Sequence, residues 1–567
     1  MKTTKLTTAE ALLLAVFAAH PLLVPGTKVE ESFTLHAVRD MLVHGWGDAD
    51  ALDKWDHLEF AGAVPRSFVP PLLLSAARWS PLSVASQLGL VTDGVAAQTT
   101  IRVALALLSA SSIIFFSRRL SAAYGAKVAK YFLLLQATSF HVPFWAGRTI
   151  PNMLAFPLVQ FAFGVLVTPP AISDNSASTR RSTKRNLAAA LSLLAITAVI
   201  FRLELVTLLV PFALEHLIRG TLSLTDLFVP GLASTGAALA VSSALDTKLW
   251  RSPTWLWPEG HAAWFNVVLG KSSEWGVEPL LFYFFPTLPR LLHLALPFAL
   301  FSLAIDRRTR RLLWPCIAFV ALMSALKHKE WRFVVYVVPP FFASAAAGIV
   351  ALGSLTSSPR LRRLALLAVV ALNLFTTLLG LAASSSNYPG LAAVRALEAH
   401  LTPSPSAPTS PGTAQPIPLP GGVAAQAAVL RVWVGIEAKM KGASDFALFD
   451  APLSTRRDEA WYLSRSAAGL RGPAFVEYSK SEAGSLVDHT REGEGEGGLY
   501  AALQRQRFDY AIVDADALTP GAEIVFQASE FGGIDWTELV KGQVRSWEGL
   551  VGKKRRESVR VIKVERA

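Results

Sequence analysis

Long apolar runs separated by short polar segments occupy the first 385 residues of this 567-residue chain. Stretches of about 17–20 apolar residues are long enough to cross the hydrocarbon of a bilayer as helices. The runs are continuous and do not alternate with polar positions, which excludes a transmembrane β-barrel. The pattern predicts an all-α, multi-pass membrane protein with about 11–12 transmembrane helices. We expect spans at residues 12–24, 101–117, 128–145, 187–200, 205–218, 226–245, 280–304, 312–326, 334–352 and 364–383, and one more between 152 and 180.

Residues 67–90 are apolar but interrupted by Pro70, Pro71, Arg78 and Pro81. Because proline removes a helical hydrogen bond and kinks helices, this segment is typical of a surface-lying or re-entrant piece. Whether it crosses the membrane stays open at this point.

The composition changes after residue 384. Residues 402–422 are rich in Pro, Ser, Thr and Gly, which is typical of a flexible linker. Beyond them, short strand-like pieces such as Phe508 to Val513 predict a small soluble domain of mixed α/β structure. We therefore expect a membrane domain over residues 1–390, a linker over 391–422 and a C-terminal domain over 423–567.

The charge distribution supports the membrane assignment. The chain is 52% hydrophobic and 17% charged, and its net charge is +12. The Lys and Arg clusters flank the apolar runs, as expected for the cytoplasmic ends of spans, so we expect no nucleic-acid partner. Cys316 is the only cysteine, which excludes an intrachain disulfide, and no His/Cys cluster has metal-ligand spacing.

The segments that mix acids, aromatics and glycines fall together on the opposite face of the membrane. The first of them contains Glu30 and Glu31, adjacent carboxylates just beyond the first span. Like-charge repulsion raises the pKa of one of such a pair, so that it can serve as a general base. A solvated acidic turn is the alternative interpretation.

Further polar side chains on this face are candidates for binding sugar hydroxyls, because ionisable and amide groups near a membrane usually face a polar cavity. Local ion pairs, pairing between helices and an aromatic belt at the membrane interface are the alternative interpretations. The candidates are Asp56, His57, Glu59, Arg66, Arg148, Asn152, Arg202, Glu204, Asn266, Lys271 and Trp275.

The hexapeptide His328-Lys329-Glu330-Trp331-Arg332-Phe333 separates two apolar runs. His328, Lys329 and Arg332 can neutralise a phosphate, with Arg contributing a bidentate fork and Lys a point charge. No Gly-rich nucleotide loop is present, so the phosphate is not expected to belong to ATP.

This hexapeptide resembles the HKExRF signature of glycosyltransferase family 22, endoplasmic-reticulum mannosyltransferases of the GT-C fold. Within the family, the chain resembles the branch that adds the α-1,6-linked eighth mannose to the lipid-linked oligosaccharide. The resemblance covers residues 10–390 or so, and Ala61 departs from it where a proline is expected before the glycine. It is carried by Thr27 to Phe33, Asp56 to Phe60, Val64-Pro65-Arg66, Arg148 to Asn152, Trp257 to Gly260 and Lys271 to Gly276.

The resemblance implies an inverting transfer of mannose from dolichyl-phosphate mannose to a dolichyl-diphosphate oligosaccharide, at a lumenal active site. It implies that Glu30 is the base, with Glu31 close behind, and that Lys329, His328 and Arg332 stabilise the departing phosphate. It implies no cofactor and no metal. Besides its two substrates we expect membrane lipid as a partner, and a monomeric protein.

Three alternatives remain open from the sequence. A sister mannosyltransferase that makes an α-1,2 bond, in the N-glycan or glycolipid-anchor pathway, would share the hexapeptide. A lipid transporter or flippase would carry its charges near the bilayer midplane and show internal repeats, and we find none. A structural subunit of a larger membrane complex is the third.

Overall fold

The computed structural model of the chain divides into two compact units, which we describe separately. The first unit comprises residues 1–24, 33–82 and 99–381, and the second comprises residues 25–32, 83–98 and 382–567. The structure describes residues 5–46, 49–53, 55–59, 62, 64–75, 84–85, 88–90, 94–167, 177–385, 387–401, 429–434, 475–479, 510–514, 523–530 and 556–564.

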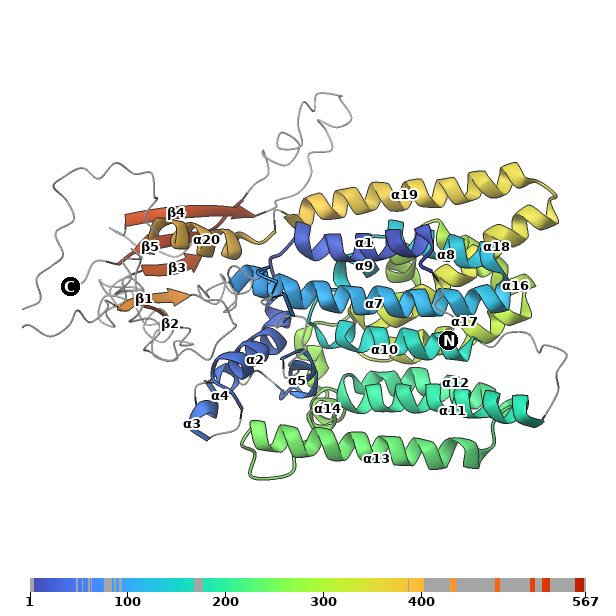
Figure 1. Cartoon of the computed structure of the whole chain (residues 1–567), viewed down its shortest axis with the longest axis horizontal. Coiled ribbons are helices and arrows are strands. Elements are labelled where there is room, and N and C mark those ends of the chain that lie inside the picture. The colour runs from blue at the N-terminus through green and yellow to red at the C-terminus, as the bar shows by residue number, and fades with distance from the viewer. Residues whose placement is uncertain are drawn as a thin grey trace, which may run out of the picture. The chain divides into compact units, whose positions relative to one another are not determined.

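The first unit is helical, and its long helices lie roughly side by side (Figure 1). These are α1 (Thr8–Leu23), α7 (Gly94–Tyr124, whose first residues belong to the second unit), α8 (Ala126–Thr138), α10 (Pro151–Leu166), α11 (Ala177–Ile200), α12 (Val206–Ile218), α13 (Leu224–Leu249), α16 (Ala295–Ile305), α17 (Arg307–Ser324), α18 (Val338–Leu355) and α19 (Pro359–Ser385). Shorter helices connect them: α2 (Ser32–Val43), α3 (Ala49–Leu52), α4 (Asp56–Glu59), α5 (Val69–Ser75), α9 (His141–Trp145), α14 (Pro258–Ala263) and α15 (Leu288–Leu292).

The helices fall on the apolar runs that the sequence marks as spans, and the chain is a multi-pass membrane protein. Among the described residues, five helices are long and apolar enough to cross a membrane, or six if one bent pair counts as a span. Two further described helices, α1 and α10, are apolar but shorter. The expected total of 11–12 spans therefore stays a prediction.

The run at 280–304 is not one straight helix. It is divided into Tyr283–Leu292 and Ala295–Ile305, which meet at an angle of 108°. His293 lies at the break with a positive φ of 47°, which is incompatible with a continued right-handed helix, and Pro286 and Pro289 precede it. The apolar character of the run predicted a single span, because composition alone does not register a local change of backbone direction.

Helices α16 and α18 pack closely through a glycine. A Cβ atom on Gly348 would overlap the carbonyl oxygen of Phe298, so only glycine allows this approach. Small residues at helix contacts are the usual means of close packing between membrane helices.

Hydrogen bonds attach the segment from α2 to α5 to the C-terminal end of α13. The carboxylate of Asp246 accepts the Phe68 backbone N–H at 2.7 Å, and the Trp250 indole donates to the Arg66 carbonyl at 2.9 Å. The His57 ring forms a hydrogen bond through Nε2 with the Leu249 carbonyl at 2.8 Å. These bonds fix where the loop at residues 66–68 lies.

The second unit contains a mixed five-stranded sheet in the order β2-β1-β3-β5-β4. Strand β1 pairs in parallel with β2 and β3, whereas β5 is antiparallel to both β3 and β4. The strands are β1 (Val429–Val434), β2 (Phe475–Ser479), β3 (Tyr510–Asp514), β4 (Glu523–Glu530) and β5 (Arg556–Lys563).

Helix α20 (Pro389–Leu401) packs beside β4 and β5 (Figure 1). Its Leu391, Val394 and Leu397 share an apolar core with residues of β3 and β5. The first eleven residues of the expected linker are thus helical, because this apolar face is buried against the sheet. The remainder of the linker, residues 402–422, lies outside the described residues.

Candidate functional site

A largely buried polar cluster joins α10 to two short 3-10 helices, η2 (Leu203–Leu205), which follows α11, and η6 (Trp331–Val337), which precedes α18. Arg202 forms an ion pair with Glu204, with Nε at 3.0 Å from Oε2, and its guanidinium lies 5.4 Å from the centre of the Phe333 ring. The other Glu204 oxygen accepts from the Asn152 amide at 2.7 Å, and that amide also donates to the Tyr336 hydroxyl at 3.2 Å. Three of the expected site residues, Asn152, Arg202 and Glu204, are thus in one network.

Glu259 extends this cluster from α14. Its side chain is 6% exposed, and its Oε2 accepts the Leu203 backbone N–H at 2.8 Å. Burial raises the pKa of the Glu259 carboxyl to about 6, although the charges of Arg202 and Arg66 act in the opposite direction. Glu259 is therefore a buried acid with a raised pKa that feels the charges of two guanidinium groups.

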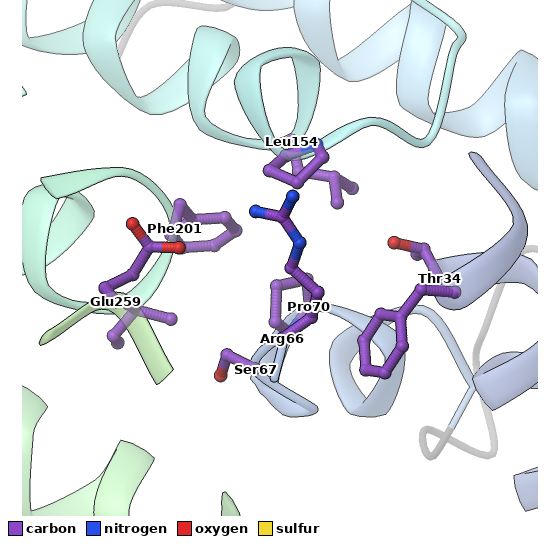
Figure 2. A pocket seen from close by; sticks show the side chains of 10 residues that line it. Thr34, Arg66, Ser67, Pro70, Leu154, Phe201 and Glu259 are labelled. Carbon is purple, nitrogen blue, oxygen red and sulfur yellow. The ribbon is translucent and has the colours of Figure 1, made fainter. Parts of the chain in front are cut away.

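Arg66 projects into a pocket of the first unit. Figure 2 shows its guanidinium in the middle of the pocket, with Glu259 and Phe201 on one side and Thr34 on the other. The pocket encloses about 280 Å³ of space, part of it open to solvent, and is lined by Phe33, Thr34, Arg66, Ser67, Pro70, Pro151, Leu154, Ile200, Phe201 and Glu259.

The Arg66 guanidinium donates no hydrogen bond to any residue that the structure describes. Burial and the charge of Arg202 lower the pKa of Arg66, while Glu259 and Glu204 raise it. A guanidinium stays protonated in proteins, so Arg66 brings a positive charge and five donors to this pocket. Such a group is suited to a phosphate or a cluster of hydroxyls.

The hexapeptide forms an ion-paired turn. Arg332 binds both carboxylate oxygens of Glu330, with Nη2 at 2.7 Å from Oε1 and Nε at 2.6 Å from Oε2. The His328 ring lies 3.2 Å from the same Oε1 atom. Glu330 thus holds two of the three candidate phosphate-binding groups in place.

Lys329, the third of them, is 5% exposed. Its ammonium group donates to the backbone carbonyls of Glu278, at 3.0 Å, and of Leu326. Burial lowers the pKa of Lys329. These bonds place its charge between the hexapeptide and the segment that follows the Trp-rich loop.

An aromatic layer lies beside the hexapeptide. Trp331 contacts His141 and Trp145 of α9, with ring centres 5.4 and 5.2 Å apart. Arg148 is fully buried, and its guanidinium lies 4.7 Å from the Phe144 ring and 5.4 Å from the Trp145 ring. Arg148 therefore lies on the aromatic side chains of α9, and its predicted contact with substrate remains a prediction.

Asp56 and His57 of α4 do not line the pocket. His57 is 4% exposed and surrounded by the rings of Phe68 and Trp250, each 4.7 Å away. Asp56 accepts from His36 at 2.8 Å. These contacts favour the local structural interpretation for both residues, and their predicted role in sugar binding stays untested, as does that of Glu59.

The Trp-rich segment contributes short helical turns. Asn266 lies in a π-helical turn (Trp264–Val268) and donates to the Ala262 carbonyl at 2.9 Å. Lys271 begins a 3-10 turn (Lys271–Trp275) and is exposed. Their roles, and that of Trp275, remain predictions.

Glu30 and Glu31 belong to the second unit, in the short 3-10 helix η1 (Val29–Glu31). Glu31 is fully buried, and its carboxylate accepts the Lys28 backbone N–H at 3.0 Å. Glu30 is exposed. Of the two, Glu30 is therefore the carboxylate accessible to a substrate, and its convergence with the hexapeptide remains a prediction.

Sequence reasoning gave no role to Glu259, Asp246 or Tyr336. Glu259 stands within the quoted Trp257 to Gly260 segment, and its signal was an acid immediately after a proline in a loop rich in aromatics. Asp246 could have been found as an acid within a helix long enough to span a membrane. Tyr336 lies in an apolar run and gave no signal.

Known proteins are similar to this chain over most of its first 404 residues. The model of the Alg9-like mannosyltransferase family matches residues 11–404. The chain is 32% identical over 390 residues to Dol-P-Man:Man(7)GlcNAc(2)-PP-Dol alpha-1,6-mannosyltransferase of Arabidopsis thaliana, which covers 68% of this chain and 74% of the relative. The protein of the same name from Drosophila melanogaster is 33% identical over 396 residues, 68% of this chain and 54% of the relative.

A solved structure shares the fold. ArnT from Cupriavidus metallidurans, bound to undecaprenyl phosphate, superposes with a TM-score of 0.52 at 13% identity, over 98% of this chain and 97% of that one. At this identity the likeness shows the fold alone, and it agrees with the expected GT-C architecture. The family match covers more than half of the chain, and the chain belongs to the Alg9-like mannosyltransferase family.

Proposed function

We propose that this chain transfers mannose from dolichyl-phosphate mannose to the seven-mannose dolichyl-diphosphate oligosaccharide, forming an α-1,6 bond, on the lumenal side of the endoplasmic-reticulum membrane. The observation that carries the proposal is the similarity to relatives of that activity over about two thirds of the chain, 68% for the Arabidopsis protein. The cationic pocket and the ion-paired hexapeptide support it, because the donor carries a phosphate.

The reaction is an inverting displacement. The acceptor mannose 6-hydroxyl attacks the anomeric carbon, the bond from that carbon to the phosphate oxygen breaks, and dolichyl phosphate leaves. The proton of the hydroxyl passes to a carboxylate, for which we propose Glu30, since Glu31 is buried and occupied by the Lys28 amide.

The leaving phosphate requires cations placed before the reaction begins. We propose His328, Lys329 and Arg332 for this role, as the resemblance implies. We add Arg66, because its guanidinium can bind a phosphate without first breaking an ion pair to a described residue. Among the other candidates, Asn152, Arg202 and Glu204 stabilise the contact between α10 and the residues that follow α11 through their hydrogen bonds.

The test is a transfer assay with the purified full-length chain, labelled donor and the seven-mannose acceptor. We expect one added mannose that resists an α-1,2-specific mannosidase and is released by an α-1,6-specific one. An α-1,2 linkage would instead assign the chain to a sister enzyme. Movement of labelled lipid without a new glycosidic bond would indicate a transporter.

A variant pair tests the base. Glu30→Gln should lower the rate by about 10²–10⁴-fold, the usual contribution of a general base. Glu31→Gln keeps an oxygen that can accept the Lys28 amide, so it should lower the rate much less. The reverse order of effects would move the base to Glu31.

A further inference from the structure

The segment that carries Glu30 and Glu31 is held within the second unit by residues that are distant from it in the sequence. The Gln98 amide donates to the Pro25 carbonyl at 2.9 Å. The Lys28 ammonium donates to the Asn387 carbonyl at 3.4 Å, across 359 residues of sequence. The two ends of the turn are therefore attached to different parts of the same unit.

Tyr388 makes the closest of these contacts. A Cβ atom on Gly26 would overlap Cγ of Tyr388 and lie 2.6 Å from its Cβ, so the tyrosine packs directly against the glycine backbone. The Lys28 ammonium lies 5.0 Å from the centre of the same ring, within the range of a cation–π interaction. The ring thus contacts the turn at two residues, Gly26, which precedes η1, and Lys28, which caps its N-terminus.

Lys28 connects the Tyr388 ring to the segment that carries Glu30 and Glu31. Its backbone N–H is capped by the Glu31 side chain, which is fully buried, and the resulting 3-10 turn leaves Glu30 exposed. Because η1 has only three residues, the direction of Glu30 depends on where Lys28 is held.

Tyr388 is in turn held by the C-terminal sheet. It directly precedes α20, and it packs against the core formed by Leu391, Val394, Val559 and Val561. The ring therefore connects the turn at residues 26–31 to the β-sheet, to which neither the resemblance nor the comparisons give a role.

We propose that Tyr388 is a positioning residue for the catalytic base, and that one function of the C-terminal unit is to hold the Glu30 turn through the contacts of this ring with Gly26 and Lys28. The inference rests on the proposed function, because it requires that a carboxylate of this turn takes the acceptor proton. Tyr388 itself does not touch the reacting atoms.

The first test measures kcat and the donor KM of Tyr388→Ala and Tyr388→Phe in the full-length protein. A displacement of about 1 Å at a reacting group costs about 10²-fold in rate, so Tyr388→Ala should lower kcat by about that factor and leave the donor KM within about threefold. Tyr388→Phe keeps the ring and should stay within about threefold of the wild type in kcat.

Lys563→Met is the matched control, because it removes an ion pair with Glu523, 3.2 Å apart, in the same sheet. It should leave kcat unchanged. If Tyr388→Ala does not fold, Gly26→Ala serves instead, since its added methyl group displaces the turn from an intact tyrosine. Equal effects of Lys563→Met and Tyr388→Ala would indicate general destabilisation and overturn the proposal.

A double variant separates positioning from a structural role. If Tyr388 acts through Glu30, then Tyr388→Ala should add little to the loss already caused by Glu30→Gln. Two losses that multiply would overturn the proposal. The wild-type protein in the same assay distinguishes a failure of the proposed function from a failure of this inference. If the wild-type protein forms no α-1,6 product, the proposed function is wrong. If Tyr388→Ala has a normal kcat, only the inference about Tyr388 is wrong.

Discussion

The ion pair between Glu330 and Arg332 leads to a prediction opposite to the one that charge counting suggests. If Glu330 only neutralised a phosphate-binding cation, its replacement by glutamine would free Arg332 and strengthen donor binding. In the structure Glu330 instead fixes Arg332 through two contacts and His328 through a third. We therefore expect Glu330→Gln to impair the transfer of mannose.

The magnitude follows from those contacts. Glutamine keeps one acceptor but turns an NH₂ group toward the guanidinium, so one charge-assisted hydrogen bond is lost and the other keeps only the charge of its donor, a loss of about 2 kcal/mol in total. The side chains of Arg332 and Glu330 are 15% and 32% exposed, and solvent screening reduces the figure to about 1–2 kcal/mol. That corresponds to a loss of about 5–30-fold in kcat/KM for the donor.

The assay is a series of initial rates over donor concentration at saturating acceptor. Asp306→Asn is the matched control, because it alters another carboxylate–arginine pair, that with Arg308 at 2.9 Å, away from the hexapeptide. It should change kcat/KM less than about twofold. A Glu330→Gln enzyme with unchanged kcat/KM, or with a lower donor KM, would refute the reasoning.

Three further predictions concern packing, pH and metal. Gly348→Ala should lower the thermal unfolding midpoint in detergent, because its methyl group overlaps the Phe298 carbonyl and costs about 1–3 kcal/mol, whereas Gly231→Ala, with nothing within 4 Å, should not. The Glu259 carboxyl has a pKa raised from 4.5 to about 6, so its contribution of about 2 kcal/mol to stability is complete below pH 4.5 and lost as the pH rises through 6. Glu259→Gln should remove that fall, and an unfolding midpoint with the same pH dependence in both proteins would contradict it. Dialysis against EDTA should leave the transfer rate unchanged, and recovery only with an added divalent ion would show that a metal takes part.

The sequence predicted the helices well because bilayer thickness imposes a length on apolar runs, and length is visible without a structure. Residues 391–401 of α20, which we expected to be part of the linker, form a helix because their apolar face is buried against the sheet. The break at His293 was not predictable in this way, since the run is apolar on both sides of it.

The site was predicted as a set of residue types, but not as an arrangement. Arg202, Glu204 and Asn152 were separate candidates in the sequence, and only the structure shows that they form one hydrogen-bonded network. His57 lies among aromatic rings instead, because Trp250, almost two hundred residues later in the chain, packs against it. The pairing of Gly26 with Tyr388 likewise depends on a contact within the second unit between residues 362 positions apart, for which local sequence holds no signal.

The attachment of the pocket loop to α13 makes the thickness of the bilayer relevant to catalysis. Only 17% of the most apolar window of α13 is buried within the protein, which leaves much of the surface of this helix available to lipid. Its 26 residues extend about 39 Å, and the stretch between Asp226 and Asp246 extends about 30 Å, close to the thickness of the hydrocarbon, so a change in that thickness changes the tilt of the helix. Because Asp246 and Trp250 bind the backbone at Phe68 and Arg66, a change of tilt moves the guanidinium in the pocket. We expect the transfer rate to depend on the acyl-chain length of the surrounding lipid, with an optimum in membranes as thin as those of the early secretory pathway.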